Sequence, residues 1–193
     1  MIQKLLDIDR RIIFVLVFVA VAVPLLAGMV MPITPTKEVQ AAYDEIEKRA
    51  AGDVVLVSFS YGASTVPEMQ PMARAILRHA FRRELKIVAI CLWPEATGLA
   101  QEVLEDMAAE FELQYGVDYT FMGYKPGNFS VILNMGQDFH SAFPQDNWGA
   151  KADELELTRP LRSLKDFDLV LILPRAIPSS SGGFPTGRRS SVF

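Results

Sequence analysis

The sequence is poor in the residues that build stapled or metal-held proteins. It has one cysteine, Cys91, so no disulfide can form within the chain and a cysteine-stapled scaffold is excluded. Its two histidines, His79 and His140, are far apart and have no cysteine cluster beside them, which argues against a zinc site. The formal net charge of −4 gives no broad basic surface for nucleic acid. We therefore predict no metal, no cofactor and no nucleic-acid partner.

Glycine-rich phosphate-binding motifs are also missing. No G-x-G-x-x-G follows the first predicted strand, so a dinucleotide site of the usual kind is not supported. Gly182 and Gly187 have the spacing of a P-loop, but Arg188 stands where that motif needs lysine, and no helical pattern follows. We interpret this spacing as coincidence.

An uncharged run from Ile12 to Ile33 is the most prominent feature that is present. A helix over this run, at about 1.5 Å per residue, would cross the roughly 30 Å hydrocarbon core of a bilayer. A buried core helix would keep a polar stripe, and the apolar region of a signal peptide would be shorter and end at a small-x-small cleavage site. The run therefore predicts a single uncleaved transmembrane helix over 12–33.

The charges beside this run predict an orientation. Arg10 and Arg11 abut its amino end, whereas Lys37 is the first charge on the other side. The positive-inside bias then makes residues 1–11 a cytoplasmic flank and places the following domain outside the cytoplasm. The predicted localisation is a single-pass membrane protein, with the lipid bilayer and a membrane protein as expected partners.

Residues 34–173 alternate between strand-like and helix-like patterns. Apolar, β-branched runs predict buried strands near 53–60, 85–92, 118–123 and 168–173, and helical periods predict helices over 36–51, 66–84, 99–115 and 128–135, while 138–150 looks like a loop. Buried strands separated by helices imply right-handed crossovers with helices on both faces. The predicted fold class is α/β, a doubly wound, mostly parallel Rossmann-like sheet preceded by one N-terminal transmembrane helix.

The last stretch, residues 174–193, breaks this alternation. It is rich in proline, serine, glycine and arginine and has no apolar period, so we expect it to be disordered. The run from Leu169 to Leu173 is the most apolar of the predicted strands, which suits a central strand with neighbours on both sides. We therefore expect the tail to be a truncated or frameshifted end of a longer α/β chain.

Four segments of this domain resemble a family of uncharacterised bacterial membrane-anchored Rossmann-like α/β proteins. They are VSFSYGASTVPEMQPMARAILRH (Val57 to His79), LWPEATGLAQ (Leu92 to Gln101), YGVDYTFMGYKPG (Tyr115 to Gly127) and SLKDFDLVLIL (Ser163 to Leu173). The resemblance implies a fold and a membrane location but no reaction. Members of the family look longer, with further α/β units and a second hydrophobic span, and this chain departs from them after Leu173.

Two loops at the carboxyl ends of predicted strands form the candidate ligand site. In open parallel sheets, ligands bind beyond these ends, near the switch in strand order. The loop from Ser60 to Thr65 offers hydroxyls and the free amides of a helix N-terminus to an anion, and Lys125 after the third strand offers a positive charge. The predicted lining residues are Ser60, Tyr61, Ser64, Thr65, Lys125 and Asn128. The alternative is that Gly62 only turns the chain and Ser64 or Thr65 only caps the helix, with Thr65 and Glu68 in a capping box.

The other reactive side chains give weaker signals. Asp138, His140 and Ser141 place an acid, a base and a hydroxyl in one predicted loop, but a nucleophile and its base seldom come from sequence neighbours. Cys91 lies in a strand-like run and is best interpreted as a small buried hydrophobe. We therefore assign no catalytic residue.

Two functions remain open at this point. The first is a membrane-anchored α/β module of unknown activity that binds a partner or ligand, which suits the lack of a catalytic constellation. The alternative is a membrane-bound enzyme, a hydrolase or transferase, that uses the loops after the first and third strands. The orientation of Asp138 and His140 relative to Lys125 would discriminate between them.

Overall fold

The computed structural model describes residues 10–26, 35–127 and 129–174. The chain divides into two compact units, Met1–Thr36 and Lys37–Phe193. The predicted disordered and truncated tail, apart from residue 174, and the predicted site residue Asn128 lie outside the described residues.

The first unit contains the helix α2, Arg10–Leu26. No helix in the described part of the chain is long and apolar enough to cross a membrane. α2 covers 17 described residues, starts with two arginines and contains Pro24. The predicted span over 12–33 extends into residues 27–34, which lie outside the described residues. The absence of a membrane-spanning helix from the described residues contradicts the predicted transmembrane helix over 12–33, the single-pass membrane localisation and the extracytoplasmic domain. The lipid bilayer and a membrane protein stay predicted partners.

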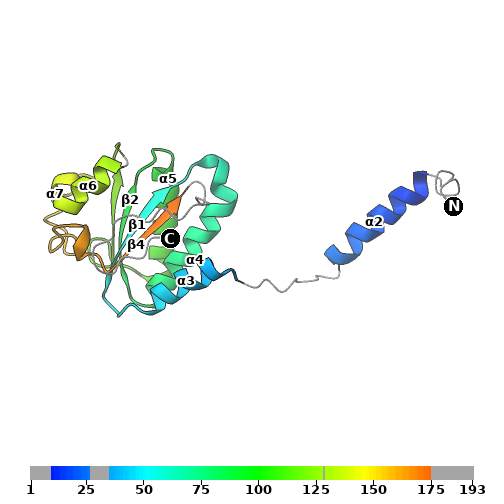
Figure 1. The fold of residues 1–193 in the computed structure, drawn as a ribbon, viewed down its shortest axis with the longest axis horizontal. Coiled ribbons are helices and arrows are strands. Elements are labelled where there is room, and N and C mark those ends of the chain that lie inside the picture. Colours follow the sequence, from blue (N-terminus) through cyan, green and yellow to red (C-terminus); the bar gives the residue numbers. More distant parts are fainter. Residues whose placement is uncertain (1–9, 27–34, 128, 175–193) are drawn as a thin grey trace. The chain divides into compact units, whose positions relative to one another are not determined.

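The second unit is built on a four-stranded sheet (Figure 1). The strands are β1 (Val54–Ser60), β2 (Lys86–Cys91), β3 (Tyr119–Tyr124) and β4 (Leu169–Pro174). Their order is β3-β2-β1-β4, and every neighbouring pair is parallel. The four predicted strands and their parallel pairing are thus confirmed.

Helices follow the strands in the order that the sequence pattern predicts. They are α3 (Lys37–Glu47), η1 (Ala63–Thr65), α4 (Val66–Arg82), α5 (Ala96–Phe111), α6 (Phe129–Gln137), α7 (Phe139–Ala142) and η2 (Leu164–Asp166). α7 lies inside the segment predicted as a loop. It forms because the side chain of Asp138 accepts a hydrogen bond from the amide of His140 and so caps a single helical turn.

The helices cover both faces of the sheet (Figure 1). On one side, called here the α4/α5 face, Val55, Val57 and Phe59 of β1 pack with residues of α4 and α5. On the other, the α6/α7 face, Leu56 packs with residues of α6, α7 and the segment before β4. This alternation fixes the face of every strand side chain, because successive residues of a strand point to opposite sides.

Candidate functional site

The strand order places a switch point beside β1. From β1 the chain moves outward to β2 and β3, then returns to the other side of β1 as β4. The carboxyl ends of all four strands lie at one edge of the sheet because all pairs are parallel. Ligands of open parallel sheets bind at this edge, close to such a switch. The loop after β1 therefore lies where a ligand is expected.

Serine hydroxyls mark the end of β1. Ser58 Oγ and Ser60 Oγ share a hydrogen bond of 3.2 Å. Ser58 is buried, whereas Ser60 is half-buried. Because Leu56 belongs to the core of the α6/α7 face, alternation along the strand puts both hydroxyls on that face. Ser60 is thus the residue of this pair that a ligand can reach.

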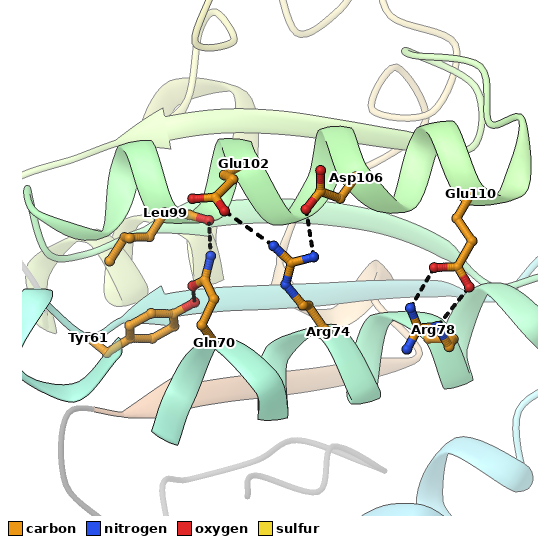
Figure 2. A network of polar contacts seen from close by, with 8 residues as sticks. All are labelled: Tyr61, Gln70, Arg74, Arg78, Leu99, Glu102, Asp106 and Glu110. Atoms are coloured by element: carbon orange, nitrogen blue, oxygen red, sulfur yellow. Dashed lines mark hydrogen bonds and ion pairs between the residues drawn. The ribbon is translucent and has the colours of Figure 1, made fainter. Parts of the chain in front are cut away.

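Tyr61 belongs to the core instead. It is fully buried on the α4/α5 face, and its hydroxyl donates to Gln70 Oε1 at 2.8 Å. Gln70 in turn donates from Nε2 to the carbonyl of Leu99 at 3.3 Å, so one chain of hydrogen bonds joins the loop after β1 to α4 and α5 (Figure 2). Burial raises the pKa of Tyr61 to about 12. The phenol therefore positions the loop rather than facing a ligand.

The amide that would hold an anion at this loop already has a partner. The backbone N–H of Ala63 donates to Glu95 Oε2 at 3.3 Å, from the loop after β2. The same carboxylate packs so closely on Gly62 that a side-chain Cβ at that position would collide with it. A carboxylate of the chain itself thus occupies one amide of the predicted anion site.

The hydroxyl of Thr65 has a different partner from the one predicted. Thr65 Oγ1 donates to the carbonyl of Gly62 at 3.0 Å, and Thr65 makes no side-chain hydrogen bond to the start of α4. The predicted capping box with Glu68 is therefore wrong, because the preceding turn η1 takes the hydroxyl. Ser64 is exposed in that same turn.

Lys125 follows β3 and points to the α6/α7 face. Its backbone N–H donates to the carbonyl of Cys91 at 3.1 Å, which holds it beside the end of β2. Its ammonium lies 6.0 Å from the ring centroid of Phe143, a geometry of cation–π contact. The side chain is half-buried, and none of the ion pairs formed by the described residues includes it.

The predicted lining residues thus divide into two groups. Ser60 and Lys125 lie on one face at the carboxyl edge, separated by the width of β2, or about 10 Å at the usual strand spacing. Tyr61 is enclosed on the opposite face, and Thr65 and Ser64 lie in the turn that leads to α4. The geometry favours the α6/α7 side of the edge as the place for a ligand.

The other reactive groups of the described chain are held in structural contacts. His140 Nε2 lies 3.1 Å from the carbonyl of Thr158, and Asp138 caps α7. Cys91 is buried, as the sequence indicates, and burial raises its pKa to about 12, so the thiol stays protonated. The hydrolase or transferase alternative stays a prediction.

One buried acid was missed by the sequence analysis. Asp146 is 5% exposed, accepts the hydroxyl of Tyr115 at 2.6 Å, and accepts the amides of Trp148 and Ala150 at 2.9 and 2.8 Å. Burial, and then this bond to Asp146, raise the pKa of Tyr115. The run Asp-Asn-Trp-Gly over 146–149 is typical of a turn and could have indicated that Asp146 bonds to nearby backbone amides. Both oxygens of Asp146 are used in shaping this loop, which makes the residue structural.

The strand order and the two helical layers define a Rossmann-like parallel α/β domain. Comparisons with protein-family models, curated proteins and solved structures gave no match to this chain. The family resemblance drawn from the sequence therefore stays a prediction.

Proposed function

We propose that this domain is a binding module for a small anionic ligand, held at the carboxyl edge of the sheet on the α6/α7 face. The observation that carries the proposal is Lys125, a half-buried residue whose ammonium lies 6.0 Å from the ring centroid of Phe143 and forms no ion pair with the described residues. A charge withdrawn partly from water is normally balanced by an opposite charge. An anion from solution supplies that balance.

Ser60 supports the same location. Its hydroxyl can donate or accept, and it faces the same side of the sheet as Lys125. With about 10 Å between the two residues, a ligand that reaches both carries an anionic group at one end and a hydrogen-bonding group at the other. The proposed role is binding and positioning, since the acids, bases and thiol described above serve the fold.

The proposal is tested by thermal unfolding of the full chain with inorganic phosphate, acetate and an uncharged polyol. A ligand at roughly ten times its Kd stabilises the folded state by about 1.4 kcal/mol. We expect phosphate or acetate to raise Tm in the wild type and the polyol to have no effect. Lys125→Met should abolish the rise.

Lys165→Met is the matched control. Lys165 is an exposed lysine in η2, which precedes β4 and therefore lies at the amino ends of the strands, away from the carboxyl edge. This variant should keep the full effect of the anions. An equal rise in Tm for wild type and Lys125→Met, or no rise for any anion, would contradict the proposal.

A further inference from the structure

The outer edge of β4 is the candidate for a second interaction surface. β4 is the last strand of the described sheet and pairs there only with β1 (Figure 1). Its side chains are buried on both faces, with Leu169, Leu171 and Leu173 on the α4/α5 face and Val170 on the α6/α7 face. Strands apolar on both faces normally lie inside a sheet, with a neighbour on each side.

The backbone groups that point outward can be assigned. The amide of Lys86 donates to the carbonyl of Asp53, so the odd-numbered residues of β1 bond to β2 and the even-numbered ones bond to β4. The register that pairs Val55 with Leu169 then directs the amides and carbonyls of Leu169, Leu171 and Leu173 toward β1. The amides and carbonyls of Val170 and Ile172 therefore point away from the sheet. They offer a new strand a ladder of donors and acceptors.

The opposite edge of the sheet is protected by the chain itself. The amide of Asn147 donates to the carbonyl of Phe121 in β3 at 3.0 Å, and the ring of Trp148 packs 6.0 Å from that of Phe121. A loop thus covers the free groups of β3, as proteins commonly do to prevent edge pairing. The described residues provide no such cover for β4.

The leucines of β4 are placed symmetrically about Leu171. Leu169 to Leu173 reads LVLIL, and in the opposite direction LILVL. In an antiparallel pair centred on Leu171, leucines therefore face leucines on one side of the sheet, and valine faces isoleucine on the other. Residues 175–193 contain Pro178 and Pro185 and have no apolar run of strand length, so their sequence suits this edge poorly.

We propose that β4 pairs antiparallel with β4 of a second copy of this chain, about a two-fold axis through Leu171. The contact is isologous, because the same strand serves both partners. It joins two four-stranded sheets into one continuous sheet and extends both core faces across the axis. It does not depend on the anion site.

Cysteine cross-linking of the full chain tests this register. In the proposed pair the two copies of residue 171 are directly opposite as a non-hydrogen-bonded pair, with Cα atoms about 4.5 Å apart, within reach of a disulfide. The two copies of residue 170 are offset by two positions and lie about 8 Å apart, beyond that reach. Leu171→Cys should therefore form at least tenfold more disulfide dimer under mild oxidation than Val170→Cys. The wild type is the blank, because its Cys91 is buried.

A second experiment covers the case in which Leu171→Cys does not fold. Residue 170 faces residue 172 of the other copy, so mixed Val170→Cys and Ile172→Cys chains should cross-link although Val170→Cys alone does not. Absence of a disulfide in both experiments would overturn the proposal, as would equal cross-linking of Val170→Cys and Leu171→Cys alone. Cross-linking of Leu171→Cys only after removal of residues 175–193 would also overturn it, since the chain's own tail would then cover the edge.

Discussion

Thr120 is the least satisfied polar side chain of the described core. It is fully buried in β3, and its hydroxyl has no hydrogen-bond partner. A buried hydroxyl without a partner costs about 1–3 kcal/mol, whereas an apolar group of the same shape does not carry that cost. The residue thus weakens the fold locally.

Thr120→Val is expected to raise the free energy of unfolding, by about 1 kcal/mol. Thr158→Val is the control, because its equally buried hydroxyl donates to the carbonyl of Ala152 at 2.6 Å. That variant should lose about 1–2 kcal/mol. Urea unfolding of both measures the difference, and a marked loss of stability in Thr120→Val would show that the hydroxyl has a partner.

Gly62 and Glu95 are expected to be coupled. An alanine at position 62 displaces the carboxylate of Glu95, which is the flexible end of an exposed side chain. Gly62→Ala should therefore cost less than about 1 kcal/mol. Adding Glu95→Ala to that variant should cost nothing further, although Glu95→Ala alone removes the bond to Ala63. Strict additivity in this double-mutant cycle would contradict the contact.

At the scale of elements, α3 is held to the end of α4 by a small polar cluster. Glu47 Oε1 lies 2.8 Å from His79 Nε2, and the ring of Tyr43 stacks on the ring of His79 with centroids 4.3 Å apart. Arg83 donates to the carbonyls of Glu47 and Arg49. The hydrogen bond from His79, and then the charge of Arg83, lower the pKa of Glu47 below its usual value of 4.5.

The stability contributed by Glu47 should therefore depend on pH. A carboxyl group whose pKa is lower in the folded state stabilises that state above its unfolded pKa, and this contribution is lost as pH falls through the folded pKa. We expect Glu47→Gln to be less stable than the wild type at pH 7. The difference between the two proteins should shrink as the pH falls below 4.5, the usual pKa of the carboxyl group. Urea unfolding from pH 7 into this acid range tests the effect, and a difference that does not shrink would contradict it.

The elements differ in how far their sequence predicts them. The strands were predictable because a run such as Val54 to Ser60 is mostly apolar and contains three β-branched valines, and burial on both faces selects such runs. The hydrogen-bond partner of Thr65 was not predictable in this way. A threonine hydroxyl can bond to a nearby carbonyl as readily as to an amide at the start of a helix. The membrane span was predicted from the length of an uncharged run alone, and no described helix is long and apolar enough to form it.

The candidate site was predictable only in part. The predicted ends of the strands identify the residues at the carboxyl edge of the sheet. Ser60 and Lys125 could therefore be assigned to that edge from the order of elements alone. The face that each side chain takes depends on packing between distant segments. Tyr61 is enclosed because Gln70 bonds to it, and Asp146 is buried because Tyr115, far away in the sequence, reaches it. Patterns within one segment do not contain those contacts.

At the scale of the whole molecule, the two edges and the carboxyl end of the sheet serve different purposes. One edge is covered by the loop around Asn147, and we propose that the other pairs with a second copy. The carboxyl end carries the half-buried residue Lys125, whose ammonium lies over the ring of Phe143. The central claim is that this ammonium binds an anion on the α6/α7 face.

An NMR titration of the isotope-labelled full chain with inorganic phosphate tests that claim most directly. We predict saturable amide shifts grouped at Ser58, Ser60, Leu92, Lys125 and Phe143, which belong to the α6/α7 face. The same titration of Lys125→Met should leave those amides unchanged. Shifts confined instead to Ala63 and the start of α4, or unaltered by the loss of Lys125, would contradict the account.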